Sequence, residues 1–278
     1  MWSVGGAGDG SHQTQFTART TGGSWIMKKL WIIVPFVLLL GACTSQEYLG
    51  PVDTKRASQL NAELGLGYMN EGQFERAKYK LDKAIKFDPD NAHAYHYMAE
   101  LYRRLKEYDK AADNYQKAMS LAPNDMNIQN NYGVYLCERG MYEKAYQHFH
   151  KIIDNPLYPA RANAYENVGL CALREGKLQL AEQSFRSALQ IDPKMPKSLI
   201  QLAQLNYDKG NSTLAYDYFK RYIAIAQQTP ESLWVGILLE NDLGHKDTVA
   251  SYKVLLKGKF PDSDEAKRLR KLEKSGRL

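Results

Sequence analysis

The chain has 278 residues, of which 44% are hydrophobic and 24% charged, and its formal net charge is +6. This length is enough for a single domain with an N-terminal arm, and the mild charge excess gives no case for nucleic-acid binding. The three cysteines show no paired spacing of the kind that binds zinc.

Residues 1–26 are rich in glycine, serine and threonine and contain one basic residue, Arg19. They precede a segment that has the character of a secretion signal, and a polar lead of this length would bury that signal. We therefore predict that Met27 is the natural start and that residues 1–26 are a non-native or mis-assigned extension.

Residues 27–42 have the ordered parts of a secretory signal peptide. Two lysines follow Met27, an apolar run extends from Leu30 to Leu40, and small residues precede Cys43. The run is too short to span a bilayer well, although a transmembrane anchor or an ordinary signal peptide remains an alternative. The ending Leu-Gly-Ala-Cys resembles a bacterial lipobox, which implies that Cys43 becomes the first residue and receives acyl chains. Such chains anchor stably, because each buried methylene contributes about 0.8 kcal/mol.

The residue after the cysteine is Thr44, not the aspartate common in lipoproteins kept in the inner membrane. By resemblance, this implies an outer-membrane lipoprotein on the periplasmic face of a Gram-negative envelope. Residues 43–56 are expected to be a flexible tether. Removing the residues before Cys43 takes away three basic side chains and one acidic one, which leaves a net charge of +4. We interpret this excess as a solvated helix face.

From residue 57 onward, small, large and proline residues recur at intervals of about 34 residues. Small residues at two positions allow a pair of helices to pack closely, and a larger residue between them fills the seam between units. The small residues are Gly65, Ala99, Gly133, Gly169 and Ala203, with Ala77, Ala111, Ala145, Ala181 and Ala215 as their partners. The seam residues are Leu81, Tyr115, Phe149, Phe185 and Phe219. This period and order resemble the tetratricopeptide repeat (TPR), which is a pair of antiparallel helices.

Turn signals separate the helices of each unit. Glycines are placed where each first helix would end, at Gly72, Gly140, Gly176 and Gly210. Lys106 occupies the corresponding place in the second unit, so we expect that turn to differ slightly. Prolines end the second helices at Asp88-Pro89, Ala122-Pro123 and Asp192-Pro193, because proline disfavours helix in the residue before it.

Three features modify the regular array. The interval from Gly133 to Gly169 is 36 residues, which places a wider loop at 154–159. A degenerate sixth unit is expected over 232–261, and residues 264–274 are expected to form a charged capping helix. The predicted fold is therefore all-α: a TPR superhelical solenoid of about six helix-turn-helix repeats with a C-terminal capping helix, over residues 57–275.

The sequence shows no pattern typical of catalysis or cofactor binding. It lacks a phosphate-binding glycine loop, a zinc-protease helix and a nucleophile elbow. His93 and His96 are three residues apart, but no third metal ligand accompanies them, so ordinary histidines are favoured. Cys137 and Cys171 are not at equivalent repeat positions, and we expect small core residues more than a disulfide, although the periplasm would permit one. We expect no catalytic residue, metal, cofactor or small-molecule substrate.

In such arrays the first helices line a concave groove, and their polar residues are candidates for contact with a protein partner. Asparagine amides can both donate to and accept from a peptide backbone, and Arg103, Arg104 and Arg174 can hold a carboxylate. At Asn131 and Asn167 a structural role is favoured over partner contact. The candidates are His93, His96, Tyr97, Arg103, Arg104, Asn127, Asn130, Asn131, Glu138, Asn163, Glu166, Asn167 and Arg174.

Several segments go beyond a generic repeat. They are Gln59–Tyr68, Asn130–Cys137, Leu157–Leu170, Thr248–Tyr252 and Phe260-Pro261. With the lipobox, they resemble the type IV pilus biogenesis and stability lipoproteins of the PilW/PilF family. The resemblance implies a pilotin, which binds the pilus secretin and promotes its outer-membrane localisation and multimerisation. The 26 leading residues and the basic tail after Pro261 have no place in this resemblance.

Two other functions remain open from the sequence. One is a general periplasmic TPR adaptor lipoprotein that recruits cell-wall hydrolases or proteases. The other is a lipoprotein enzyme with an unrecognised site, which the absence of catalytic patterns makes the weaker alternative. The pilotin and the general adaptor share the same fold, anchor and groove, so only the family-like segments favour the pilotin.

Overall fold

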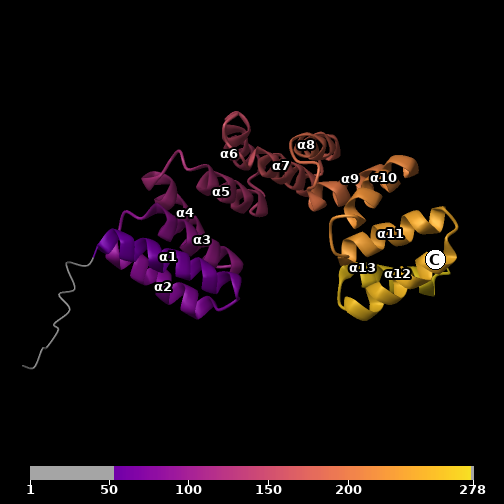
Figure 1. Cartoon of the computed structure of the whole chain (residues 1–278), viewed down its shortest axis with the longest axis horizontal. Helices are drawn as coiled ribbons and strands as arrows, with labels where there is room; N and C mark the ends of the chain where they lie inside the picture. Colours follow the sequence, from indigo (N-terminus) through magenta and orange to yellow (C-terminus); the bar gives the residue numbers. More distant parts are fainter. Residues whose placement is uncertain (1–52, 277–278) are drawn as a thin grey trace, which may run out of the picture. The chain divides into compact units, whose positions relative to one another are not determined.

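The computed structural model describes residues 53–276, and the regular structure in that range is entirely helical (Figure 1). The helices follow one another in chain order with short connections. They are α1 (Thr54–Asn70), α2 (Phe74–Phe87), α3 (Ala92–Arg104), α4 (Tyr108–Leu121), α5 (Met126–Glu138), α6 (Tyr142–Ile153), α7 (Arg161–Glu175), α8 (Leu178–Ile191), α9 (Pro196–Asp208), α10 (Ser212–Ile223), α11 (Pro230–Asp242), α12 (Lys246–Lys259) and α13 (Asp264–Lys274).

The helices pair in sequence, from α1 with α2 to α11 with α12, and α13 packs on the last pair. Each first helix also contacts the first helix of the next pair: α1 with α3, and so on to α9 with α11. Within residues 53–276, the second helices make no such contact with one another. The first helices therefore form a continuous layer, whose exposed side we call the first-helix face. Six repeats and a capping helix confirm the predicted TPR solenoid.

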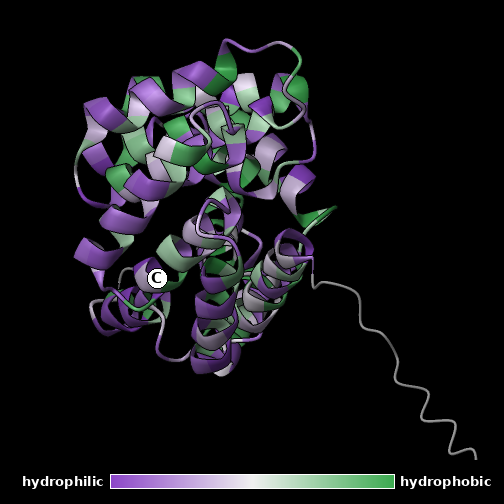
Figure 2. Ribbon diagram, turned by 90° about the vertical axis from the view of Figure 1, so that its left-hand side faces the viewer, coloured by the Kyte–Doolittle hydropathy of each residue, from purple (hydrophilic) through white to green (hydrophobic). Residues whose placement is uncertain are grey.

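The small residues are needed where first and second helices approach. A Cβ atom on Gly133 would lie 2.7 Å from Phe149 Cε1, and one on Gly169 would lie 2.6 Å from Phe185 Cε1. The predicted seam residues Leu81, Tyr115, Phe149 and Phe185 are fully buried, and Phe219 is nearly so. Along the helices, hydrophilic and hydrophobic residues alternate, as expected when each helix buries one side (Figure 2).

The turns between first and second helices use the left-handed backbone region. Gly72, Gly140 and Gly176 have φ angles of 73°, 72° and 85°. Lys106 has a φ of 62°, so the expectation of a different turn in the second unit was wrong. Packing of the flanking helices imposes the same left-handed backbone on Lys106 as on the glycines. This conformation costs more free energy for a lysine than for a glycine, because lysine has a Cβ atom.

The ends of the array agree with the sequence pattern except at the start. Helix α1 begins at Thr54, and its N-cap Asp53 accepts a hydrogen bond of 3.0 Å from Arg56 N. The helix therefore includes the last residues of the segment 43–56 that was expected to be a flexible tether. The expected extension, signal peptide and Cys43 lie outside the described residues. Within residues 53–276, no helix is both long and apolar enough to cross a membrane.

Candidate partner-binding face

A disulfide joins two neighbouring first helices. Cys137 on α5 and Cys171 on α7 are bonded, with their Cα atoms 5.7 Å apart. The expectation of unbonded core cysteines was therefore wrong. It rested on their unequal repeat positions, but α5 and α7 are in direct contact, and two residues need only approach across that contact to be joined. The bond links the units on either side of the long loop at 154–159.

An ion-pair network links α3 to α5. Arg103 Nη1 lies 2.8 Å from Glu138 Oε1, and Arg103 Nη2 lies 2.9 Å from Glu100 Oε2. The Tyr115 hydroxyl donates to Glu100, which is 9% exposed. Burial, followed by the charge of Glu100, raises the pKa of Tyr115 well above its usual value, so the phenol stays protonated. Two candidate groove residues, Arg103 and Glu138, are thus already paired with each other, and Arg103 is shared with Glu100.

A second set of polar contacts runs through α3, α5 and α7. His96 is 3% exposed, and its Nε2 lies 2.8 Å from Asn131 Nδ2. Asn167 Nδ2 donates to Asn130 Oδ1 over 2.9 Å, and Asn130 Nδ2 lies 3.3 Å from Asn131 Oδ1. Burial lowers the pKa of His96, so this ring is neutral at physiological pH. These four side chains hold successive first helices in register.

Two further candidates stabilise helix ends. Glu166 Oε2 accepts hydrogen bonds from Ser198 N (3.1 Å) and Ser198 Oγ (2.8 Å) in the first turn of α9. Met195, the N-cap of α9, offers no side-chain acceptor, so the carboxylate of α7 takes that role. Arg104 Nη1 donates to the Met69 carbonyl at the end of α1 over 3.0 Å.

The remaining candidates keep more of their polar groups available. His93 is exposed and its Nε2 lies 3.3 Å from Asp125 Oδ2, while Asn127 Oδ1 accepts a 2.7 Å hydrogen bond from the Tyr158 hydroxyl. Tyr97 is half-buried, and burial raises the pKa of its phenol. Asn163 and Arg174 are exposed. Among the described residues, no ion pair or side-chain hydrogen bond involves the Arg174 guanidinium.

A hollow of about 60 Å³ lies between α5 and α7 on this face. Val134 and Leu170 contribute apolar lining, both cysteines of the disulfide line it, and the exposed Arg174 is a further lining residue. Such an arrangement can take an apolar side chain of a partner while a neighbouring carboxylate binds Arg174. We regard this hollow as the centre of the candidate site. Its lining residues are Val134, Cys137, Glu138, Phe149, Asn167, Leu170, Cys171 and Arg174.

Two buried polar residues of the first helices, Glu100 and Gln129, were not among the residues predicted from the sequence. Gln129 is 2% exposed; its Nε2 donates to the Pro123 carbonyl over 2.6 Å, and its side-chain oxygen contacts His148. For Glu100 a signal existed, because Tyr115 occupies a seam position that is leucine or phenylalanine in the first, third, fourth and fifth units. A buried phenol needs a hydrogen-bond partner, and an acid on the facing first helix supplies one.

Comparison with known proteins agrees with this architecture. Family models of the tetratricopeptide repeat match residues 92–125, 128–196 and 172–233. The type IV pilus assembly protein PilF of Pseudomonas aeruginosa is 32% identical over 236 residues, which cover 83% of this chain and 94% of that protein. An uncharacterized protein of Haemophilus influenzae is 29% identical over 163 residues, which cover 59% of this chain and 89% of that protein.

Two solved structures are similar along most of their length. The structure of Pseudomonas aeruginosa PilF superposes with a TM-score of 0.70 at 32% identity and covers 78% of this chain and 98% of that one. The structure of PilW, described as a widely conserved type IV pilus biogenesis factor, gives a TM-score of 0.66 at 30% identity. That match covers 76% of this chain and 97% of PilW.

Proposed function

The chain belongs to the PilF family of type IV pilus TPR proteins, and from that premise we propose that it is a pilotin of the pilus secretin. In this proposal it is an outer-membrane lipoprotein that takes part in pilus biogenesis without catalysis. It binds the secretin and promotes its localisation and multimerisation at the outer membrane. The observation that carries the proposal is the 32% identity to PilF over 94% of that protein.

The first-helix face supplies the binding surface in this proposal. Most of its polar residues are already paired between units, which keeps the face rigid before a partner arrives and reduces the entropy lost on binding. The hollow between α5 and α7 then accepts an apolar anchor of the secretin, and Arg174 binds an adjacent carboxylate. A buried anchor beside a charged contact is typical of residues that dominate binding energy.

The test is capture of the secretin by the tagged full chain from detergent-solubilised membranes. Arg174→Glu should reduce the captured secretin at least fivefold, because it places a negative charge beside the carboxylate that Arg174 would bind. Arg270→Glu is the matched control: it makes the same charge change at an exposed residue on α13 and should capture as much secretin as the unchanged chain.

Two results would contradict the proposal. If the unchanged chain captures cell-wall hydrolases or proteases but no secretin, it is a general periplasmic adaptor. If Arg174→Glu and Arg270→Glu capture secretin equally, the hollow between α5 and α7 is not where the secretin binds.

A further inference from the structure

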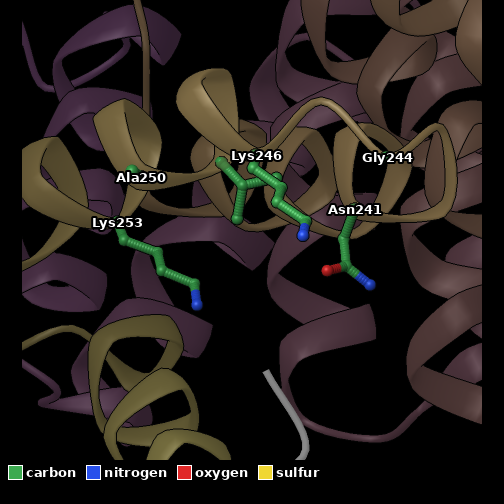
Figure 3. Close-up of a pocket in the computed structure, with 6 residues that line it drawn as sticks. Asn241, Gly244, Lys246, Ala250 and Lys253 are labelled. Atoms are coloured by element: carbon green, nitrogen blue, oxygen red, sulfur yellow. The ribbon is translucent and has the colours of Figure 1, made fainter.

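A second and larger hollow, of about 250 Å³, lies in the last helix pair of the array, α11 and α12. Asn241 and Gly244 contribute from the end of α11 and the turn that follows it. Lys246, Val249, Ala250 and Lys253 contribute from one side of α12. In Figure 3 the side chains of Asn241, Lys246 and Lys253 extend toward the same open side of this hairpin.

This hollow is open because the described repeats end beside it. Each earlier helix pair is covered by the first helix of the next pair, whereas the last pair is covered only by α13, an 11-residue helix. Lys253 Nζ lies 3.9 Å from Glu273 Oε1 in the last turn of α13, so the hollow adjoins the point where α13 stops. Gly276, with a φ of 67°, then turns the backbone out of helical conformation.

The lining of the hollow is positively charged around an apolar floor. None of its six residues is acidic. Lys253 shares Glu273 with Lys257, and Lys246 takes part in no ion pair of residues 53–276. Val249, at the floor, is 7% exposed. Lys246 and Lys253 are seven residues apart on one helix, which separates them by about 10 Å along its axis.

We propose that this hollow is a docking site for an acidic segment of a protein partner. The segment presents two carboxylates about 10 Å apart, one for Lys246 and one for Lys253, and an apolar side chain between them for Val249. In an extended chain, side chains four residues apart lie on the same face about 13 Å apart, with one more side chain on that face between them. The flexible lysine and glutamate side chains take up the difference from about 10 Å. A flat anionic membrane offers no side chain to reach the recessed apolar floor, so a peptide is the better occupant. The site does not depend on the pilotin function or on Arg174.

The experiment measures binding of a fluorescent peptide to the detergent-solubilised full chain by fluorescence anisotropy. The peptide has two glutamates four residues apart with a leucine midway between them, and a second peptide replaces both glutamates with glutamine. We expect the glutamate peptide to bind at least tenfold more tightly than the glutamine peptide. Lys246→Glu should weaken binding at least tenfold, and Arg174→Glu should leave it unchanged.

The matched control is Lys259→Glu, which makes the same charge change at an exposed position of α12 outside the hollow. It should change the affinity less than twofold. The proposal is overturned if the glutamate peptide does not bind, or if Lys246→Glu and Lys259→Glu weaken it equally. It is also overturned if Lys246→Glu instead abolishes self-association in sedimentation, or binding to phosphatidylglycerol vesicles, while peptide binding persists. Those results would assign the hollow to a second copy of the chain or to lipid.

Discussion

At the scale of single residues, the array depends on which positions accept a side chain and which do not. Gly169 on α7 has no room for one, because Phe185 of the paired helix already fills the space. Gly67 on α1 is also inside a helix, but a Cβ atom there would meet nothing within 4 Å. These two glycines therefore separate the effect of packing from the effect of helix propensity.

Gly169→Ala should lower the free energy of unfolding by about 1–3 kcal/mol, because its Cβ would lie 2.6 Å from Phe185 Cε1. Gly67→Ala should raise it by about 0.5–1 kcal/mol, since alanine is the better helix former and meets no obstacle. Urea denaturation followed by circular dichroism measures both. Equal effects of the two substitutions would show that the assigned repeat register is wrong.

A buried neutral histidine makes stability depend on pH. Burial is the main cause that lowers the pKa of His96, while the charges of Glu100 and Asp125 act against it. In the unfolded chain the ring titrates near 6.5, so below that pH the unfolded state binds more protons than the folded one. Stability is therefore expected to be full above pH 6.5 and to fall as the pH decreases further.

The measurement compares unfolding free energies at pH 7.5 and 5.5 for the unchanged chain and for His96→Gln. The substitution should reduce the loss of stability at the lower pH. His150→Gln, at an exposed histidine on α6, is the control and should leave this loss of stability unchanged. A pH dependence that His96→Gln does not alter would assign the effect to other groups.

At the scale of helices, the joint between the third and fourth units is unusual. The connection from α6 to α7 is the long loop, whereas α5 and α7 are joined covalently by Cys137 and Cys171. The disulfide closes a loop of 34 residues, which restricts the unfolded chain. It also holds together the two helices that flank the proposed secretin-binding hollow.

Reduction of this disulfide should therefore lower stability by about 2–4 kcal/mol. The comparison is urea denaturation with and without dithiothreitol. Cys137→Ala should reproduce the lower stability in oxidising buffer and should no longer respond to the reductant. If the oxidised and reduced forms of the unchanged chain unfold at the same urea concentration, the bond contributes nothing to the joint.

The helices were largely predictable from sequence, because the spacing of Gly133, Ala145 and Phe149 is set by contacts within one helix pair. The left-handed conformation of Lys106 was not predictable from the sequence, since the flanking helices impose it. The polar face was predictable only in part: repeat position indicates that Glu166 is on a first helix, but not that it caps α9. The disulfide depended in the same way on how α5 lies against α7, which no local pattern reveals.

At the scale of the whole molecule, the proposal combines two functions in one chain. The repeats provide a rigid surface for a protein partner, and acylated Cys43 would hold that surface at the outer membrane. Cys43 lies outside the described residues, so its role comes from the lipobox-like sequence before it. We expect the two functions to be separable, because the helix contacts described above all lie within residues 53–276.

The most direct test of the proposal is the membrane location of secretin multimers in a strain that lacks this protein. Complementation with the unchanged chain should restore multimers to the outer-membrane fraction, as measured by density fractionation and immunoblotting. Cys43→Ala should give a folded protein that leaves the membrane fraction and fails to restore them. Secretin multimers that reach the outer membrane equally well without the protein would contradict the account.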